Sequence, residues 1–360
     1  MKRTLLPFFA VALLALGSTA AFAQVDVTVT GSTAFRAITI DRAYALFDPA
    51  SRVSQTNNAS IGLITMTGTM SNAAPSLGGT SVKLRLSFSG SEQGMQDVRN
   101  QTPISTAALP GEAAPGVSNI TKIPDLALSD VFPSSATPPI PESAFNRAVV
   151  GTVPILFVKN KALTGVTNIT QAQANLLMVA SGTGGMPASF LGGNNNNPVY
   201  FIGRDSGSGT RITAEKCTGF VGSPLMWATN VGGAYIVTNG FSSGGLVRGV
   251  VNAKSDAIGI MSYSDYAAIS NNAAILPFNG IAFSHTNVTV GQYSIWGYQH
   301  LVNKVGLSGT KATVRDALIS AISNPGFQGT NTLYNVGFTA FSEMHVERGS
   351  DGGTITSLDF

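Results

Sequence analysis

Short hydrophobic or alternating segments recur along the chain, and several are followed by small polar residues and then by a helix-compatible stretch. Residues 25–30 (VDVTVT) alternate like a half-buried strand. The segments that predict strands are 25–30, 82–88, 126–128, 149–159, 200–203, 257–260 and part of 281–290. Helices are predicted within 36–46, 92–98, 163–179, 211–219 and 310–323. Repeated strand, turn and helix units are typical of an α/β protein.

The stretches between these segments are polar and rich in Pro, Gly and Ser. They predict surface loops at 71–80, 102–118, 133–142 and 182–198. Residues 149–159 form the most apolar predicted strand, which indicates burial on both faces. After residue 323 the pattern weakens, and we expect a weakly structured tail.

The first 23 residues have the pattern of an export signal. Lys2 and Arg3 precede a 12-residue apolar run, and Ala21-Phe22-Ala23 supplies a small-x-small cleavage site before Gln24. The apolar run is too short for a membrane span, which needs about 20 residues. No cysteine lies near the cleavage site, so a lipid anchor there is excluded. We expect an exported protein, periplasmic where the source has an outer membrane and otherwise secreted.

Composition narrows the class of protein further. The chain has 360 residues, of which 11% are charged, with 40 Gly and one Cys. The length allows two domains, and one cysteine excludes an internal disulfide and a Cys-rich zinc module. The formal charge of +3 includes Lys2 and Arg3 of the predicted leader. Without them 19 basic residues (21 − 2) face 18 acidic ones, which indicates no nucleic-acid partner.

Residues 204–210 (RDSGSGT) carry the strongest candidate chemistry. They follow a predicted strand and precede a predicted helix, whose first N–H groups attract anions. Gly209 allows close backbone approach, Ser208 and Thr210 add hydroxyl donors, and Arg204 offers a planar fork for oxyanions. The segment lacks the Gly-Lys-Ser/Thr of a P-loop, so NTP hydrolysis is not indicated. A polar turn that merely caps the helix is the alternative.

Two other turns repeat this chemistry in weaker form. Ser32-Thr33-Ala34 follows the first strand, and Ser89-Gly90-Ser91 follows the strand at 82–88. Each alone is typical of a helix N-cap. Because strand carboxyl ends of an open α/β sheet face one crevice, the three turns together predict convergent anion donors.

Asp130, which follows the short strand at 126–128, is the acid of interest. In isolation it is a turn or capping residue. Beside an anion it makes sense if the ligand carries a proton for the carboxylate to accept. Phosphate keeps a proton at neutral pH and sulfate does not, so an acid here selects against sulfate.

Residues 204–211 (RDSGSGTR) resemble the R-x-x-G-S-G-T segment of PstS-type phosphate-binding proteins of ABC transporters. Gly31-Ser32-Thr33-Ala34-Phe35 is similar to the first loop of that family, and Ser129-Asp130 to its Ser-Asp pair. Three weaker matches are 153–160, 257–263 (AIGIMSY) and 293–298. The matches follow the order of the family and cover most of the chain after the leader.

This resemblance implies a type II periplasmic-binding-protein fold, with two lobes of mixed sheet flanked by helices and a cleft between them. It implies a first lobe of residues 24–149 and 292–360 and a second lobe of 150–291. Residues implied to bind phosphate are Ser32, Thr33, Ala34, Ser91, Asp130, Arg204, Ser208, Gly209 and Thr210. The chain departs from the family at Glu92, where a Gly-rich sequence is usual, and at Ile260, where Tyr is usual.

The resemblance therefore implies an exported, monomeric, non-catalytic protein that captures inorganic phosphate and delivers it to an ABC permease. No cofactor or metal is expected, because neither His nor Cys has ligand spacing. Three alternatives stay open: binding of another oxyanion, a surface or matrix role without transport, and serine hydrolysis at Asp205-Ser206-Gly207. The last lacks a histidine in a recognisable motif.

Overall fold

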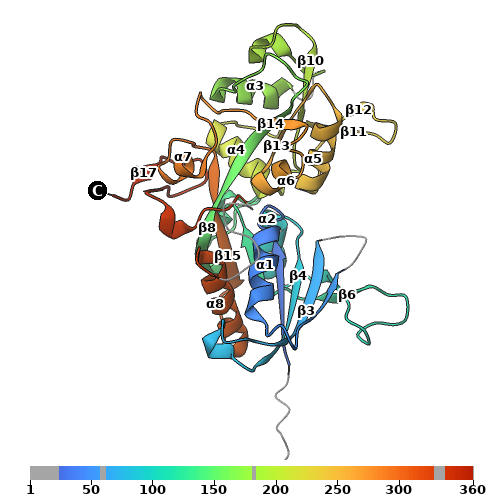
Figure 1. The fold of residues 1–360 in the computed structure, drawn as a ribbon, viewed down its shortest axis with the longest axis vertical. Coiled ribbons are helices and arrows are strands. Elements are labelled where there is room, and N and C mark those ends of the chain that lie inside the picture. The colour runs from blue at the N-terminus through green and yellow to red at the C-terminus, as the bar shows by residue number, and fades with distance from the viewer. Residues whose placement is uncertain (1–23, 57–61, 181–183, 328–336, 360) are drawn as a thin grey trace, which may run out of the picture.

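The computed structural model describes residues 24–56, 62–180, 184–327 and 337–359. The predicted leader lies outside them. Figure 1 shows two groups of elements, one above the other, with β8 (Phe145–Asn160) and β15 (Trp296–Lys304) running between them. We call the lower group, which contains the first strand, the first lobe and the upper group the second lobe. The predicted lobe boundaries stay a prediction.

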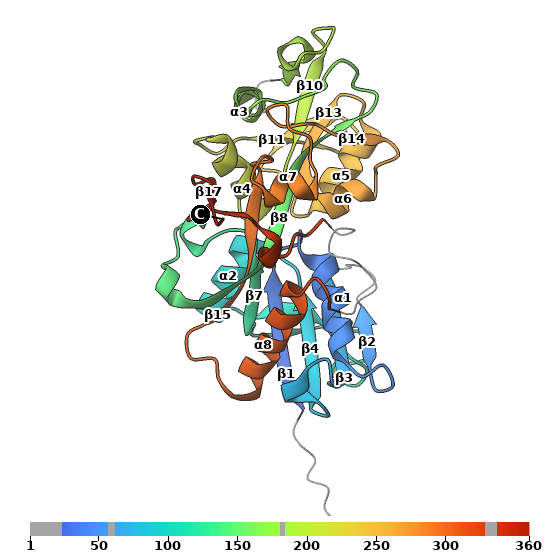
Figure 2. The same cartoon turned by 60° about the vertical axis from the view of Figure 1, so that its left-hand side comes forward.

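The first lobe combines a sheet with three helices. Its elements are β1 (Val25–Gly31), α1 (Arg36–Leu46), β2 (Val53–Thr56), β3 (Leu63–Thr69), β4 (Ser81–Ser87), α2 (Ser91–Asn100), β5 (Ile104–Ala107), β6 (Asn119–Lys122), β7 (Leu126–Ser129) and α8 (Gly309–Ser323). Helices α1 and α8 pack against each other, and α2 packs on β7. Figure 2 shows α1 and α8 beside the strands of this sheet.

The second lobe has a smaller sheet and more helices. Its elements are α3 (Gln171–Ala180), β9 (Met186–Pro187), β10 (Pro198–Ile202), α4 (Gly209–Thr218), β11 (Met226–Thr229), β12 (Tyr235–Thr238), α5 (Gly244–Ala253), β13 (Ala257–Ser262), α6 (Tyr263–Ala267), β14 (Ala273–Ile275) and α7 (His285–Thr289). Short 3-10 turns occur at Pro75–Leu77, Pro133–Ser135, Glu142–Ala144, Ala188–Leu191 and Phe341–Glu343.

A continuous strand order joins the two lobes: β12-β11-β10-β13-β8-β15-β7-β1-β4-β3-β2, with β14 on β8 and β9 on β10. Strand β1 is parallel to β4 and β7, and β10 is parallel to β11 and β13. The long strand β8 pairs antiparallel with β13 in the second lobe and with β15. The sequence predicts burial of this strand, and its residues from Val150 to Val158 are buried.

Most predicted elements are confirmed within a few residues. The helix predicted at 36–46 is α1, and the helical region predicted at 163–179 is helical from Gln171. The strand predicted in part of 281–290 is wrong, because His285–Thr289 forms α7. The Ser284 hydroxyl caps this helix by accepting a hydrogen bond from the Asn287 N–H at 3.0 Å.

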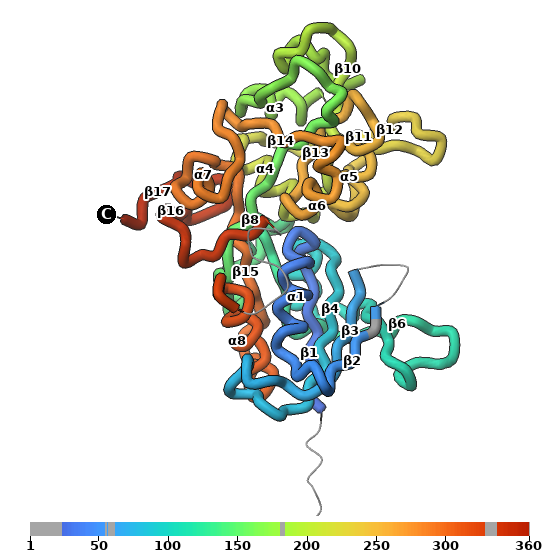
Figure 3. Tube along the Cα trace, viewed as in Figure 1, coloured from blue at the N-terminus to red at the C-terminus, as the bar shows by residue number. Residues whose placement is uncertain are grey.

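The C-terminal segment is more ordered than its sequence suggests. It contains β16 (Val346–Glu347) paired with β17 (Thr356–Ser357), and Figure 3 shows it beside the junction of the lobes. Thr339 forms a β-bridge with Thr152 of β8. Gly151 makes this approach possible, because a Cβ there would lie 1.6 Å from the Phe338 ring. The expected weakly structured tail is therefore wrong for residues 337–359.

Candidate functional site

Three turns of the first lobe meet at one edge of its sheet. They follow β1, β4 and β7, which are parallel neighbours, so their carboxyl ends point the same way. The Ser32 N–H donates a hydrogen bond to the Leu128 carbonyl of β7 at 2.8 Å, and the Gly90 N–H donates to the Gly31 carbonyl at 2.9 Å. Backbone hydrogen bonds thus hold the three turns together, as the strand pattern predicts.

Asp130 lies at the centre of this arrangement and is buried. The Ser91 hydroxyl donates a short hydrogen bond to its Oδ1 atom. From the second lobe, the Thr213 hydroxyl donates to the Asp130 carbonyl at 3.3 Å. Gly209 also packs on the carboxylate, since a Cβ there would lie 2.0 Å from Oδ1. Only glycine fits at this position while the two lobes are in contact.

Burial is the main influence on the ionisation of Asp130. It raises the pKa of the carboxyl from 3.8 to about 6. A hydrogen bond from its own backbone N–H, the charge of Arg204, and the hydroxyls of Ser32 and Thr210 each lower the pKa and offset part of that rise. Near neutral pH the group is mostly ionised and accepts hydrogen bonds.

Arg204 reaches across from the second lobe and is buried. Its Nη1 atom donates to the Thr33 hydroxyl of the first lobe at 3.1 Å. Its Nε and Nη2 atoms donate to the carbonyls of Phe241 at 3.0 Å and Ser242 at 2.9 Å. Two backbone carbonyls therefore fix the plane of the guanidinium, which faces the first turn of the other lobe.

Helix α4 begins directly after this arginine turn, with Ser208 as its N-cap residue. The Ser208 hydroxyl is buried and has no hydrogen-bond partner among the described residues. Because an unpaired buried hydroxyl is costly, such groups commonly serve a ligand or a water. The geometry thus supplies a helix N-terminus and a free hydroxyl beside Asp130.

The structure brings most of the predicted residues together. Ser32, Ser91, Gly209 and Thr210 surround Asp130, and Thr33 contacts Arg204. Ser208 adjoins Gly209, and Ala34 lies in the Ser32 turn, partly buried against the core. That these residues bind a ligand stays a prediction.

Glu92, the departure from the family pattern, lies at the contact of the lobes. Its backbone N–H donates to the Gly207 carbonyl of the second lobe at 3.2 Å. Burial raises the pKa of its carboxyl, the Thr137 backbone lowers it, and the Asp205 charge raises it further. The residue therefore contributes a backbone contact across the cleft.

Sequence reasoning missed several residues beside this site. Ser242-Ser243-Gly244-Gly245 leads into α5, which begins at Gly244, and repeats the small polar pattern of the other turns. Its Ser242 carbonyl orients Arg204. Asp265 of α6 and Arg36 of α1 act on the Arg204 guanidinium through their charges. No motif marks these two residues, since they come from different lobes.

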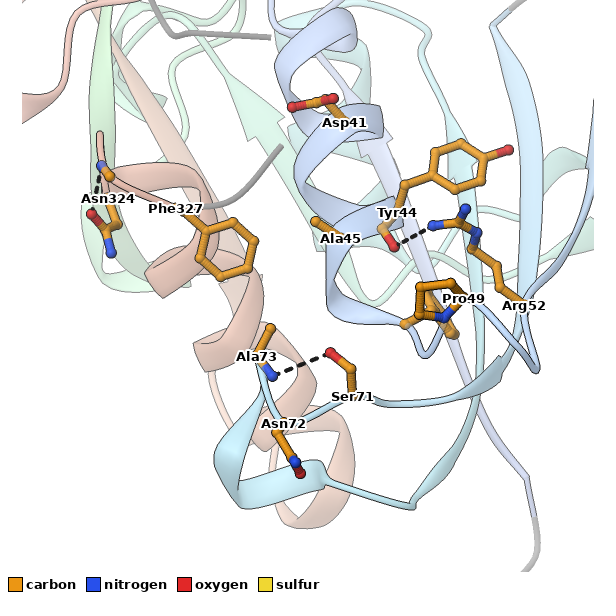
Figure 4. A pocket seen from close by; sticks show the side chains of 12 residues that line it. Asp41, Tyr44, Ala45, Pro49, Arg52, Ser71, Asn72, Ala73, Asn324 and Phe327 are labelled. Carbon is orange, nitrogen blue, oxygen red and sulfur yellow. Dashed lines mark hydrogen bonds between the residues drawn. The ribbon is translucent and has the colours of Figure 1, made fainter. Parts of the chain in front are cut away.

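A cavity of about 930 Å³ lies elsewhere in the first lobe, between α1 and residues 324–327 (Figure 4). Its lining includes Tyr44, whose carbonyl accepts a hydrogen bond from Arg52 at 2.8 Å. The Arg52 guanidinium also stacks over the Tyr44 ring at 4.5 Å. None of the predicted phosphate residues lines this cavity, so it is separate from the candidate site.

Within the described ranges, no cluster of three His, Cys, Asp or Glu side chains could hold a metal ion. The helices of the same ranges include none with the length and apolar character to cross a bilayer.

Comparison with known proteins identifies the fold. No protein-family model matches the sequence. A substrate-binding protein of Clostridium perfringens, assigned to phosphate ABC transport and solved with bound phosphate, has a TM-score of 0.57 at 16% identity, over 88% of this chain and 99% of that chain. An ABC-type phosphate transport receptor from Vibrio cholerae has a TM-score of 0.52 at 15% identity, over 87% and 99%.

A phosphate-binding protein from Stenotrophomonas maltophilia is similar at a TM-score of 0.51 and 13% identity, over 89% of this chain and 91% of that chain. These matches extend over nearly the whole length of both chains, while the identities are low. The chain thus has the type II periplasmic-binding-protein fold, and its structural neighbours are PstS phosphate-binding proteins of ABC transporters.

Proposed function

We propose that this protein captures inorganic phosphate between its lobes, without catalysis, for uptake by an ABC permease. The observation that supports this function best is the convergence of three turns, two from the first lobe and one from the second, on the buried Asp130 carboxylate. The phosphate-binding proteins of similar fold make the same ligand class the natural candidate.

Phosphate fits the charges of this site better than a fully deprotonated oxyanion. Arg204 and the N-termini of α2 and α4 attract negative oxygens. The Asp130 carboxylate then accepts a hydrogen bond from the protonated oxygen of phosphate. Sulfate would place an unprotonated oxygen against this carboxylate, and the repulsion would lower its affinity.

Closure of the lobes completes the proposed site. Arg204 contacts Thr33, Thr213 contacts Asp130, and Glu92 contacts Gly207 across the cleft. A bound anion would add ligand contacts from both sides, so it stabilises the closed form relative to the open form. A permease that recognises the closed form would then receive only loaded protein. We expect the exported protein to act as a monomer.

Isothermal titration calorimetry with phosphate, sulfate and arsenate tests this function. We expect phosphate to bind and sulfate to bind much more weakly. Arg204→Ala should weaken phosphate binding by about ten- to a hundredfold, because a charged hydrogen bond contributes about 1.5–3 kcal/mol. Arg315→Ala, on α8 and paired with Asp316, is the matched control. Equal affinity for sulfate, or unchanged phosphate affinity in Arg204→Ala, would contradict the assignment.

A further inference from the structure

Two arginines from different lobes, Arg36 and Arg248, share one aspartate, Asp265, beside the proposed phosphate site. Arg36 begins α1 of the first lobe, whereas Arg248 of α5 and Asp265 of α6 belong to the second lobe. Arg248 pairs with Asp265 at 3.6 Å. Burial lowers the pKa of Arg36, the Asp265 charge raises it, and the Arg248 charge lowers it. Asp265 and Arg36 also act on Arg204 through their charges.

Arg36 and Arg248 differ from the arginines of this protein whose guanidinium groups are held by hydrogen bonds. Arg85 donates hydrogen bonds to two carboxylates. Arg211 donates to a carboxylate and to backbone carbonyls. Arg348 donates to a backbone carbonyl and to a thiol. By contrast, neither Arg36 nor Arg248 donates a side-chain hydrogen bond to any residue that the structure describes. Their guanidinium donors are available for a ligand.

The charges around these donors do not balance. Asp265 is the single acidic partner that acts on Arg36, while Arg248 repels it. The charge of Arg204 is offset mainly by Asp205 and Asp130, so Asp265 is left as the acid that Arg36 and Arg248 share. Bringing Arg36 and Arg248 together when the lobes close therefore opposes closure, unless an anion lies between them.

We propose that Arg36 and Arg248 form an anion subsite next to the proposed phosphate site, for a phosphate compound that carries a second anionic group. Phosphoanhydrides and phosphorylated carboxylic acids belong to this class. This inference rests on the proposed function, because Arg204 and the turns around Asp130 would hold the first phosphoryl group. Each lobe supplies one arginine, so the second anionic group favours closure.

Asp265 attracts both arginines and forms an ion pair with Arg248. Its Oδ2 atom accepts a hydrogen bond from the Ser262 hydroxyl at 3.2 Å, which fixes the carboxylate at the start of α6. Its Oδ1 atom faces Arg248 at a distance too long for a hydrogen bond. The weak contact leaves the Arg248 fork able to turn towards a stronger acceptor, such as a phosphoryl or carboxylate oxygen.

Calorimetry of the purified protein with phosphate and with pyrophosphate tests the subsite. We expect the unmodified protein to bind pyrophosphate at least about tenfold more tightly than phosphate, because one additional charged hydrogen bond increases affinity by about that factor. Arg36→Gln and Arg248→Gln should each lower pyrophosphate affinity about tenfold more than phosphate affinity. Arg36→Lys keeps the charge without the planar fork and should lose less than Arg36→Gln. Arg315→Gln on α8 is the control.

Three results would overturn the inference. If phosphate binds but pyrophosphate binds no more tightly, the subsite is absent while the proposed function stands. If both variants weaken the two ligands equally, the arginines act on lobe closure or long-range attraction and not on a second group. If neither ligand binds the unmodified protein, the proposed function fails as well. Because Arg248 is partly exposed, we expect Arg248→Gln to fold. That variant alone tests the subsite if Arg36→Gln fails to fold.

Discussion

Asp130→Asn should make the ligand-free protein more stable, although it removes a residue from the centre of the candidate site. The carboxyl is buried, and burial raises its pKa from 3.8 to about 6 despite the nearby Arg204 charge and hydroxyl donors. An unfolded chain exposes the same carboxyl to water, where it ionises at its ordinary pKa. Ionisation of this group therefore opposes folding, and an amide of the same shape does not ionise.

The size and direction of the effect follow from proton linkage. Between pH values of about 4 and 6 the folded protein holds the proton and the unfolded chain has lost it. Stability from this group is therefore fully present below about pH 4 and is lost as pH rises through about 6. A difference of about two pKa units corresponds to about 3 kcal/mol of unfolding free energy. Asp351, whose pKa burial also raises to about 6, acts in the same direction.

Urea unfolding between about pH 4 and pH 8, in phosphate-free buffer, measures this effect. The stability of Asp130→Asn relative to the unmodified protein should grow by about 3 kcal/mol across that range. Asp316→Asn, at an exposed carboxylate, is the control and should show no such trend. A stability difference that does not change with pH would refute the reasoning, because the carboxyl would then ionise alike in both states.

The remaining predictions concern close contacts and one ion network. Gly209→Ala would put a Cβ 2.0 Å from the Asp130 carboxylate, so calorimetry should show a large loss of phosphate affinity while the melting temperature changes little. Gly151→Ala would collide with the Phe338 ring at 1.6 Å, and thermal melting should show a loss of about 1–3 kcal/mol with faster proteolysis of the C-terminal segment. Burial raises the pKa of Glu112, but hydrogen bonds from a buried arginine and a lysine lower it to about 2. Glu112→Gln should therefore cost about 3 kcal/mol in urea unfolding at neutral pH, with the cost disappearing as pH falls towards 2.

Much of the site could be predicted from the sequence because its parts are local. Each donor turn directly follows a strand and precedes a helix, so residues 31–35 and 204–210 reveal their chemistry without tertiary information. Asp130 could be selected because it directly follows a short apolar strand. The parallel sheet then brings these turns to one edge, which is a general property of α/β folds.

The residues that sequence reasoning missed depend on contacts between distant segments. Arg36 and Asp265 meet only when the lobes lie together, and no spacing along the chain relates them. The turn at 242–245 carries the same small polar residues as the other turns, but the short strand before it, β12, is partly exposed and weakly patterned. Helix α7 was also missed, because its β-branched residues favour a strand and the Ser284 cap was not taken into account.

The structure of the C-terminal segment could not be predicted from its sequence, because this segment is held by its contacts at the junction of the two lobes. The Arg348 guanidinium lies 3.8 Å over the Trp296 ring of β15, and its Nη1 atom contacts the Cys217 thiol of α4 at 3.1 Å. The Asp351 carboxylate accepts a hydrogen bond from the Phe132 N–H of the first lobe at 2.8 Å. Arg348 and Asp351 are only three residues apart in the chain, and they thus connect α4 of the second lobe with the loop after β7 of the first lobe.

These contacts limit how the lobes can separate. Three residue steps extend over at most about 11 Å, so a movement that pulled α4 straight away from the loop after β7 would break the contacts of Arg348 or Asp351. A rotation of the lobes about the Arg348–Asp351 segment keeps the contacts of both residues. Figure 2 shows the C-terminal strand β17 on one side of the junction, with α5, α6 and the end of α1 on the other. We therefore expect the cleft to open on the side of Arg36 and Arg248, so that a ligand would pass these two arginines before it reaches Asp130.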